Sequence, residues 1–127
     1  MRKLNASIHW YYASVLDILA AGENVRGWRR FKSTSRKLNA YYNKKLGVVI
    51  KKPVFILEHR TPIKFRVPTY ELKDDYIVQP LVSKKDLGGA LLKLREDMKP
   101  YLKRGIFPDL HRGNIGWYQG KPLMFDW

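Results

Sequence analysis

The spacing of the apolar residues changes twice along the chain, and this limits the folds that the chain can adopt. Over 5–21 they recur at three- and four-residue steps, which is typical of an amphipathic helix. Short β-rich runs fill 48–82, and helical spacing returns over 84–104. We therefore expect an α+β protein, in which a small antiparallel sheet lies between N-terminal helices and a long helix.

Capping residues predict where the N-terminal helices begin and end. Asn5 or Ser7 can cap the first helix, and Gly22 can end it. Helical spacing also predicts a second helix over 33–46, which Gly47 would end.

Two stretches after this region predict strands of different exposure. Residues 63–67 alternate apolar and basic side chains, as a half-exposed strand does. Residues 76–82 are mostly apolar, which suits a buried strand.

The last third of the chain predicts a helix followed by a hairpin. Ser83-Lys84-Lys85-Asp86 has the spacing of a capping box, and Gly105 can close the helix that follows. Strand-like runs at 116–118 and 122–125 flank Gln119-Gly120, a pair that favours a tight hairpin turn.

Length and composition set the outer limits on the class of protein. The 127 residues are 45% hydrophobic, which suits one folded domain and argues against disorder. We expect a single reduced domain with a basic helical region at 1–46, the small sheet at 47–82, and the long helix with the hairpin at 83–127. The absence of cysteine excludes thiolate metal sites. No apolar run reaches about 18 residues, so we expect a cytoplasmic protein without a membrane partner.

Positive charge is concentrated in one stretch of the sequence. Lys and Arg outnumber Asp and Glu by 25 to 11, and no acidic residue lies between Arg26 and Lys45. Such a stretch attracts nucleic acid, nucleotide phosphates or an acidic protein, although a solvated basic face has the same pattern. The candidate partner-binding residues are Arg26, Arg29, Arg30, Lys32, Arg36 and Lys37.

Three polar residues in the last third have the spacing of a phosphoryl-transfer site. Asp109 and Asn114 are joined by a short polar loop, and Asp126 follows after the expected hairpin. The hairpin would return the chain to Asn114, so that an amide oxygen and a carboxylate could hold one Mg²⁺ against a phosphate. Asp109 could then accept the proton of an incoming hydroxyl.

The segment Asp109-Leu110-His111-Arg112-Gly113-Asn114-Ile115 resembles the D-L-H-x-x-N-I catalytic loop of the kinase-like superfamily, which includes protein kinases and aminoglycoside phosphotransferases. Asp126-Trp127 resembles the start of the metal-binding Asp-Phe-Gly segment. The resemblance implies a reduced or truncated protein-kinase-like fold that binds ATP and Mg²⁺. It makes Asp109 the catalytic base, and Asn114 and Asp126 the metal ligands.

The resemblance extends to segments before this loop. Residues 84–104 resemble the long helix that precedes the catalytic loop. Residues 76–82 resemble the hinge strand that carries adenine, which makes Gln79 a nucleotide-binding candidate. The candidates for the lysine that contacts the phosphates are Lys51 or Lys52, in the Val-Val-Ile-Lys-Lys run, and, as second choice, Lys64.

Two functions remain open from the sequence. The first is a compact kinase-like enzyme that binds ATP–Mg²⁺ and transfers phosphate to an acceptor. The second is an inactive pseudokinase-like basic protein that binds nucleic acid or an acidic host protein. The chain also resembles small phage-encoded proteins, which implies the host cytoplasm and a possible role as an inhibitor. A homodimer is compatible with both functions, because a reduced lobe would expose apolar surface.

Overall fold

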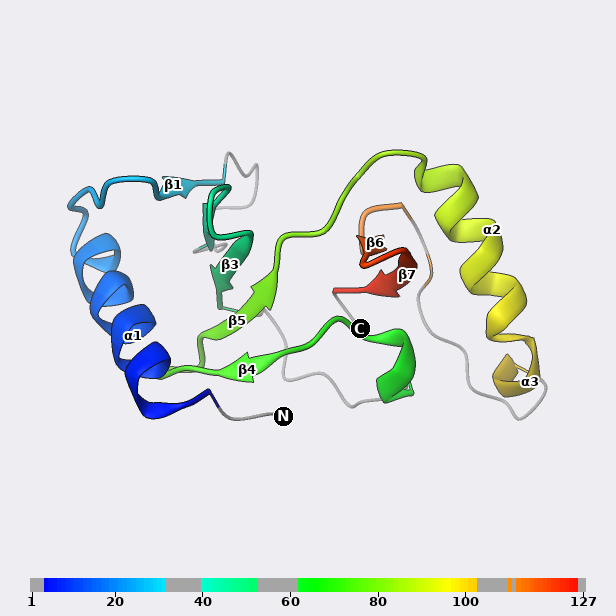
Figure 1. Cartoon of the computed structure of the whole chain (residues 1–127), viewed down its shortest axis with the longest axis horizontal. Coiled ribbons are helices and arrows are strands. Elements are labelled where there is room, and N and C mark those ends of the chain that lie inside the picture. Colours follow the sequence, from blue (N-terminus) through cyan, green and yellow to red (C-terminus); the bar gives the residue numbers. More distant parts are fainter. Residues whose placement is uncertain (1–3, 32–39, 53–61, 103–109, 111, 126–127) are drawn as a thin grey trace. The chain divides into compact units, whose positions relative to one another are not determined.

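The computed structural model describes residues 4–31, 40–52, 62–102, 110 and 112–125 (Figure 1). The chain divides into two compact units, the first made of 1–56 with 68–81 and the second of 57–67 with 82–127. The expected α+β class is confirmed, and so is an antiparallel sheet. That 1–127 is a single domain stays a prediction.

The first unit contains one described helix and a five-stranded sheet. The helix is α1 (Ala6–Ala20). The strands are β1 (Arg29–Arg30), β2 (Ala40–Asn43), β3 (Val48–Lys51), β4 (Tyr70–Glu71) and β5 (Ile77–Pro80). Their order in the sheet is β1-β2-β3-β5-β4, and every neighbouring pair is antiparallel.

Strand register divides the side chains of this sheet between two faces, because successive residues of a strand point to opposite sides. We call the side that packs against α1 the α1 face and the opposite side the far face. The α1 face contains Tyr41, Ile50 and Val78, which are aligned across β2, β3 and β5. The far face contains Tyr42, Val49, Lys51, Ile77 and Gln79, by the same register.

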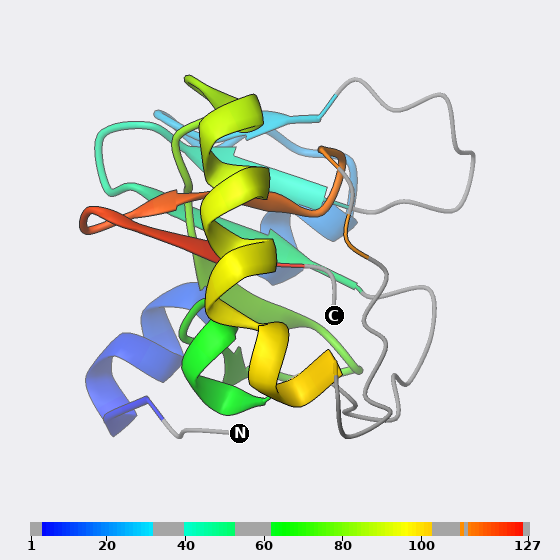
Figure 2. The same ribbon diagram turned by 90° about the vertical axis from the view of Figure 1, so that its right-hand side faces the viewer.

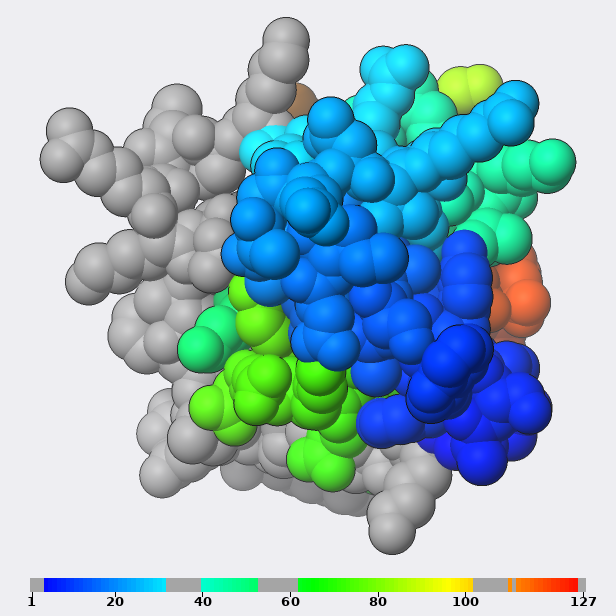
Figure 3. Space-filling view, turned by 90° about the vertical axis from the view of Figure 1, so that its left-hand side faces the viewer, coloured from blue at the N-terminus to red at the C-terminus, as the bar shows by residue number. Residues whose placement is uncertain are grey.

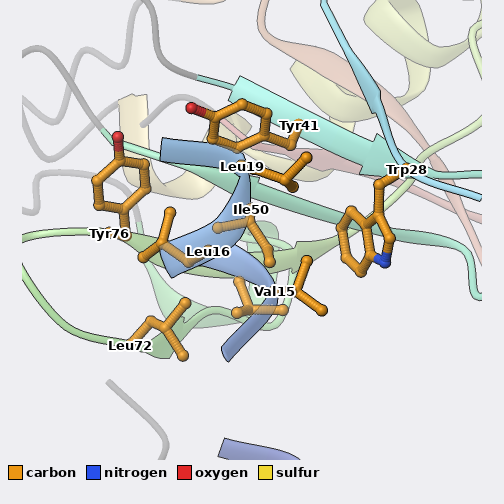
Figure 4. Close-up of a cluster of buried hydrophobic side chains, with 9 residues drawn as sticks. Val15, Leu16, Leu19, Trp28, Tyr41, Ile50, Leu72 and Tyr76 are labelled. Atoms are coloured by element: carbon orange, nitrogen blue, oxygen red, sulfur yellow. The ribbon is translucent and has the colours of Figure 1, made fainter. Parts of the chain in front are cut away.

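The first helix begins and ends where capping residues predict. The Asn5 side chain accepts a hydrogen bond from the Ile8 amide at 3.0 Å, and Gly22 has a φ of +84°. The buried face of α1 covers the α1 face of the sheet (Figure 4). The core there consists of Val15, Leu16, Leu19, Trp28, Tyr41, Ile50, Leu72, Tyr76 and Val78.

The helix expected over 33–46 is wrong in the part that the structure describes. Ala40–Asn43 form β2, which pairs with β1 on one side and β3 on the other. Tyr41 and Tyr42 therefore point to opposite faces of a sheet instead of sharing one face of a helix. Pairing with β1 and, across the turn at 44–47, with β3 is favoured by the two aromatic residues and overrides a helical spacing of only a few positions. Residues 32–39 lie outside the described part.

The second unit is built around a helix and a hairpin. Its elements are the 3-10 helix η1 (Ile63–Phe65), α2 (Leu87–Asp97), α3 (Lys99–Leu102), β6 (Ile115–Tyr118) and β7 (Lys121–Met124). Helix α2 packs against the β6–β7 hairpin (Figure 2). The core between them consists of Phe65, Ala90, Leu94, Met98, Ile115 and Met124.

Three sequence predictions for this unit need correction. The strand expected over 63–67 is instead η1, followed by a single bridge between Arg66 and Met124. The helix is capped by Asp86, whose side chain accepts from the Gly89 amide at 3.1 Å, whereas the Ser83 hydroxyl accepts from Lys85. The long helix expected over 84–104 is divided into α2 and α3 at Met98.

The hairpin and its turn are confirmed. Gln119 and Gly120 have φ values of +49° and +77°, the left-handed conformation that a two-residue turn of this type requires. Along β6, Trp117 and Ser83 exchange two backbone hydrogen bonds of 2.9 and 3.0 Å. A Cβ on Gly116 would lie 2.4 Å from Cγ2 of Val82, so this close approach requires glycine.

Within the described residues, no helix combines the length and the apolar character needed to cross a membrane.

Candidate functional site

The β6–β7 hairpin brings two distant parts of the sequence together at its open end. Ile115 pairs with Met124, and the Phe125 amide donates a hydrogen bond of 3.0 Å to the carbonyl oxygen of Asn114. Asn114 is 4% exposed, so this end of the hairpin is buried around a polar side chain. The expected return of the chain to Asn114 is therefore confirmed as far as Phe125, the residue before Asp126.

The two carboxylates predicted for this site, Asp109 and Asp126, lie outside the described residues. Their convergence with Asn114 on one metal ion therefore stays a prediction. In the described ranges, no group of three or more His, Asp or Glu side chains is placed to hold a metal. An amide oxygen with carboxylates is the donor set that Mg²⁺ prefers, and Asn114 supplies the amide at a buried position.

A lysine that the sequence reasoning missed lies at the same end of the hairpin. The Lys84 ammonium donates to the carbonyl oxygen of Ile115 at 3.0 Å and lies 4.0 Å from the centroid of the Phe125 ring. It thus contacts the residue after Asn114 and the residue before Asp126. Lys84 and Ile115 are 31 positions apart in the chain, which explains why no local pattern pointed to this lysine.

A second segment lies beside the strand that leads to Phe125. Arg66 bridges Met124, and the Val67 amide donates to the Met124 carbonyl at 2.9 Å. Partial burial lowers the pKa of the Arg66 guanidinium from its ordinary value, although such a group remains charged at neutral pH. The hairpin end is therefore supported from both sides, by Lys84 and by 66–67.

The three lysines proposed to contact phosphate have different surroundings. Lys51 is 9% exposed and lies on the far face of the sheet, opposite Ile77. Lys52 is exposed, and its ammonium lies 6.0 Å from the ring centroid of Tyr76, a residue of the α1-side core. Lys64 is on η1 rather than on a strand, and its ammonium lies 5.1 and 4.8 Å from the rings of Phe65 and Tyr101.

The expected hinge strand is β5, and its Gln79 lies on the far face, as Lys51 does. Gln79 is 2% exposed, and its Nε2 donates to the Thr69 hydroxyl at 3.0 Å. Lys51 of β3 and Gln79 of β5 thus lie buried on the same face of two neighbouring strands, and Gln79 is bonded to Thr69, the residue before β4. Polar groups at such positions are costly unless they are hydrogen-bonded, so this face is specialised relative to the apolar α1 face.

The predicted partner-binding arginines separate into two kinds. Arg26, Arg29 and Arg30 are all exposed. Arg30 also donates to the Leu19 carbonyl at 2.7 Å and to the Glu23 carbonyl at 3.3 Å, so it caps the C-terminal end of α1. Its guanidinium also lies 5.5 Å from the ring centroid of Tyr41. The other candidates in this stretch, Lys32, Arg36 and Lys37, lie outside the described residues.

An aromatic pair accompanies Arg29 on the far face. Register places Tyr42 opposite Arg29, and the Phe31 and Tyr42 rings are 4.7 Å apart at an interplanar angle of 46°. Phe31 is 40% exposed. An exposed aromatic ring beside an arginine is a surface on which a base could stack.

Comparisons with protein-family models, with curated proteins and with solved structures found no match.

Proposed function

We propose that the chain is a compact kinase-like protein that binds ATP with Mg²⁺. The observation that carries this proposal is the hydrogen bond from the Phe125 amide to the Asn114 carbonyl oxygen. It closes a hairpin with Asn114 on one side and the residue before Asp126 on the other. In protein kinases the metal ligands are an Asn of the catalytic loop and the Asp of a following segment, which is the order of Asn114 and Asp126 here.

The proposed roles follow the chemistry of each side chain. Asn114 and Asp126 hold the metal, which, when bound, neutralises charge on the nucleotide phosphates. Asp109 accepts the proton of an acceptor hydroxyl if phosphate is transferred. Lys84 holds the two strands of the hairpin in place through Ile115 and Phe125, and so positions the ligands that flank them.

The sheet contains the other residues that the resemblance assigns to nucleotide binding. Protein kinases carry the phosphate-contacting lysine on the third strand, in a V-A-I-K segment. Here Val48–Lys51 form the third strand, and Lys51 rather than Lys52 is the buried lysine of the far face. Gln79 lies on that face of the neighbouring strand, as expected of a residue near the base of the nucleotide.

Thermal unfolding of the full chain tests the proposal. ATP–Mg²⁺ at about 100 times its Kd is expected to raise the Tm by roughly 5–10 °C. Asp126→Asn should remove most of the Mg²⁺-dependent part of this shift, whereas Asp109→Ala should keep the shift and abolish phosphate transfer. Asp97→Asn, a control on the exposed side of α2, should behave as the wild type. An unchanged Tm at millimolar ATP–Mg²⁺ would refute nucleotide binding.

The second candidate function is binding of a single-stranded nucleic acid without catalysis. The observation that favours it is the exposed Phe31, paired with Tyr42 beside Arg29. Oligonucleotide binding should weaken steeply as salt rises, and Arg29→Met with Phe31→Ala should weaken it further. If the same variants leave oligonucleotide affinity unchanged, this second function is wrong.

A further inference from the structure

The ammonium group of Lys84 lies against the open end of the β6–β7 hairpin. It donates a hydrogen bond of 3.0 Å to the Ile115 carbonyl and lies 4.0 Å from the centroid of the Phe125 ring. A carbonyl oxygen and an aromatic face both favour a cation, so the charge of Lys84 is held at this place. In the sequence, Asn114 precedes the first of these contacts and Asp126 follows the second.

The backbone on both sides of Lys84 is fixed on β6. Ser83 and Trp117 exchange two backbone hydrogen bonds, and the Trp117 indole donates to the Asp86 carbonyl at 3.1 Å. Asp86 in turn caps α2 through the Gly89 amide. All of these residues belong to the second unit. An anchored segment therefore presents Lys84 to the hairpin, and such preorganisation lowers the entropy cost of placing a charged group beside a ligand.

A cation at this end of the hairpin has opposite effects on two kinds of ligand. Mg²⁺ alone is repelled by a neighbouring ammonium group, which lowers the affinity of a metal site. The phosphates of ATP carry several negative charges, so the same ammonium group attracts a nucleotide that brings Mg²⁺ with it. A lysine meets such phosphates as a point charge with three donors. The charge of Lys84 therefore affects which form of ligand the site accepts.

We propose that Lys84 is a phosphate-binding residue, which makes the site selective for the Mg²⁺ complex of a nucleotide over Mg²⁺ alone. This inference rests on the proposed nucleotide site and adds the form of ligand that the site accepts. Its basis is that one ammonium group contacts both strands of the hairpin, at the residue after Asn114 and the residue before Asp126. Holding the two strands together does not by itself require a positive charge, because a neutral amide also donates to a carbonyl group.

Lys84→Gln separates the charge from the hydrogen bond, because glutamine is neutral and can still donate to the Ile115 carbonyl. Calorimetric titrations of the full chain with ATP–Mg²⁺ and, separately, with MgCl₂ measure the two affinities. ATP–Mg²⁺ is expected to bind this variant at least about 10-fold more weakly, as for a lost charged hydrogen bond. MgCl₂ alone should bind it at least about 3-fold more tightly, because the repulsion is removed. Lys84→Arg keeps the charge and should stay within about 3-fold of the wild type for both ligands.

Two other lysines provide matched controls, because each can lose the same unit of charge at another position. Lys85 is the next residue and is exposed. Lys45 is exposed in the turn at 44–47, which projects in blue-green at the upper right of Figure 3. Lys85→Gln and Lys45→Gln should each leave both affinities within about 2-fold of the wild type at roughly 0.15 M salt, since salt screens exposed charges.

The folded state of each variant is checked by circular dichroism and by thermal unfolding without ligand. Lys84→Met is a second neutral variant, in which a thioether can pack on the Phe125 ring, and the same two changes of affinity are expected for it. A substitution that only disturbed the hairpin would weaken the binding of both ligands. The opposite signs of the two expected changes therefore distinguish an effect of charge from a loss of structure.

The remaining outcomes overturn either the site or the role of Lys84. A wild type that does not bind ATP–Mg²⁺ refutes the nucleotide site itself. If the wild type binds ATP–Mg²⁺ and the neutral variants bind it equally well, Lys84 does not bind phosphate. If the affinity for MgCl₂ falls or stays the same in the neutral variants, the charge of Lys84 does not select between the two ligands. In the last two cases the proposed nucleotide site stands, and only the role of Lys84 is wrong.

Discussion

The two faces of the five-stranded sheet have different kinds of buried residue. On the α1 face, Ile50 and Val78 are buried among apolar side chains. On the far face, Lys51 and Gln79 are equally inaccessible, at 9% and 2% exposed. The same strands supply both sets, because neighbouring residues alternate between the faces. The α1 face thus contains the apolar core under α1, and the far face buries Lys51 and Gln79 beside the apolar Val49 and Ile77.

Replacing a residue of the α1 face should have the largest effect on stability. Ile50 is fully buried in the core under α1. Ile50→Ala should lower the free energy of unfolding by about 2–5 kcal/mol, because it leaves a cavity. Urea denaturation measures this, with Leu46→Ala, at an exposed position, as the control. If Ile50→Ala lowered the free energy of unfolding by less than Leu46→Ala does, the core under α1 would not have the stabilising role described for this face.

Replacing the lysine of the far face should act on nucleotide affinity. Lys51→Met is expected to weaken ATP–Mg²⁺ binding about 10- to 100-fold, the range for losing a charged hydrogen bond of about 1.5–3 kcal/mol. Lys52→Met is the matched control, because Lys52 is the next residue and lies over Tyr76 on the other side. Titration calorimetry compares the two. Equal losses of ATP–Mg²⁺ affinity in both variants would mean that nucleotide binding does not depend on the face of the sheet on which the lysine lies.

The two adjacent arginines of β1 lie on opposite faces of the sheet, so the comparison between the faces also applies to them. Arg30→Met should lower the free energy of unfolding by about 1–2 kcal/mol, because the carbonyl oxygens at the end of α1 lose a charged donor. Arg29→Met should change it by less than about 0.5 kcal/mol, as expected at an exposed position. Oligonucleotide affinity should instead fall more in Arg29→Met than in Arg30→Met. A stability loss that is as large for Arg29→Met as for Arg30→Met would contradict the capping role.

The smallest effect expected is on the pH dependence of stability. Burial raises the pKa of Tyr12 above its ordinary value of 10.0, and the neighbouring Tyr11 raises it further. The unfolded chain therefore loses this proton first as the pH rises. The stabilising contribution is present below about pH 10 and is lost as the pH rises through the folded value. The free energy of unfolding of Tyr12→Phe should fall less steeply above pH 10 than that of the wild type.

Local signals predicted the elements that depend on local chemistry. Asn5 caps α1, and Gln119-Gly120 forms the hairpin turn, as their residue types indicate. The hairpin in turn fixes the return of the chain to Asn114, so the part of the candidate site that rests on it was predictable.

Pairing and contacts between segments account for what the sequence left open or gave wrongly. Ala40–Asn43 is a strand because it pairs with β1 and, across the turn at 44–47, with β3. Which residue of the Lys51-Lys52 pair lies on the far face depends on the register of β3, which no local pattern contains. Lys84 and Arg30 contact carbonyl groups that are 31 and 11 residues away in the chain. The spacing of one segment carries no information about such partners.

The paired register of β6 and β7 also makes the far end of the hairpin a place for engineering. Its open end is fixed by the bond between Phe125 and Asn114 and by the contacts of Gly116 with 82–83. Gln119 and Gly120 are exposed at the opposite end. Residues inserted there would lengthen the turn and leave the open end in place. A fluorescent label or a peptide tag attached at this turn would report on the molecule without entering the candidate site.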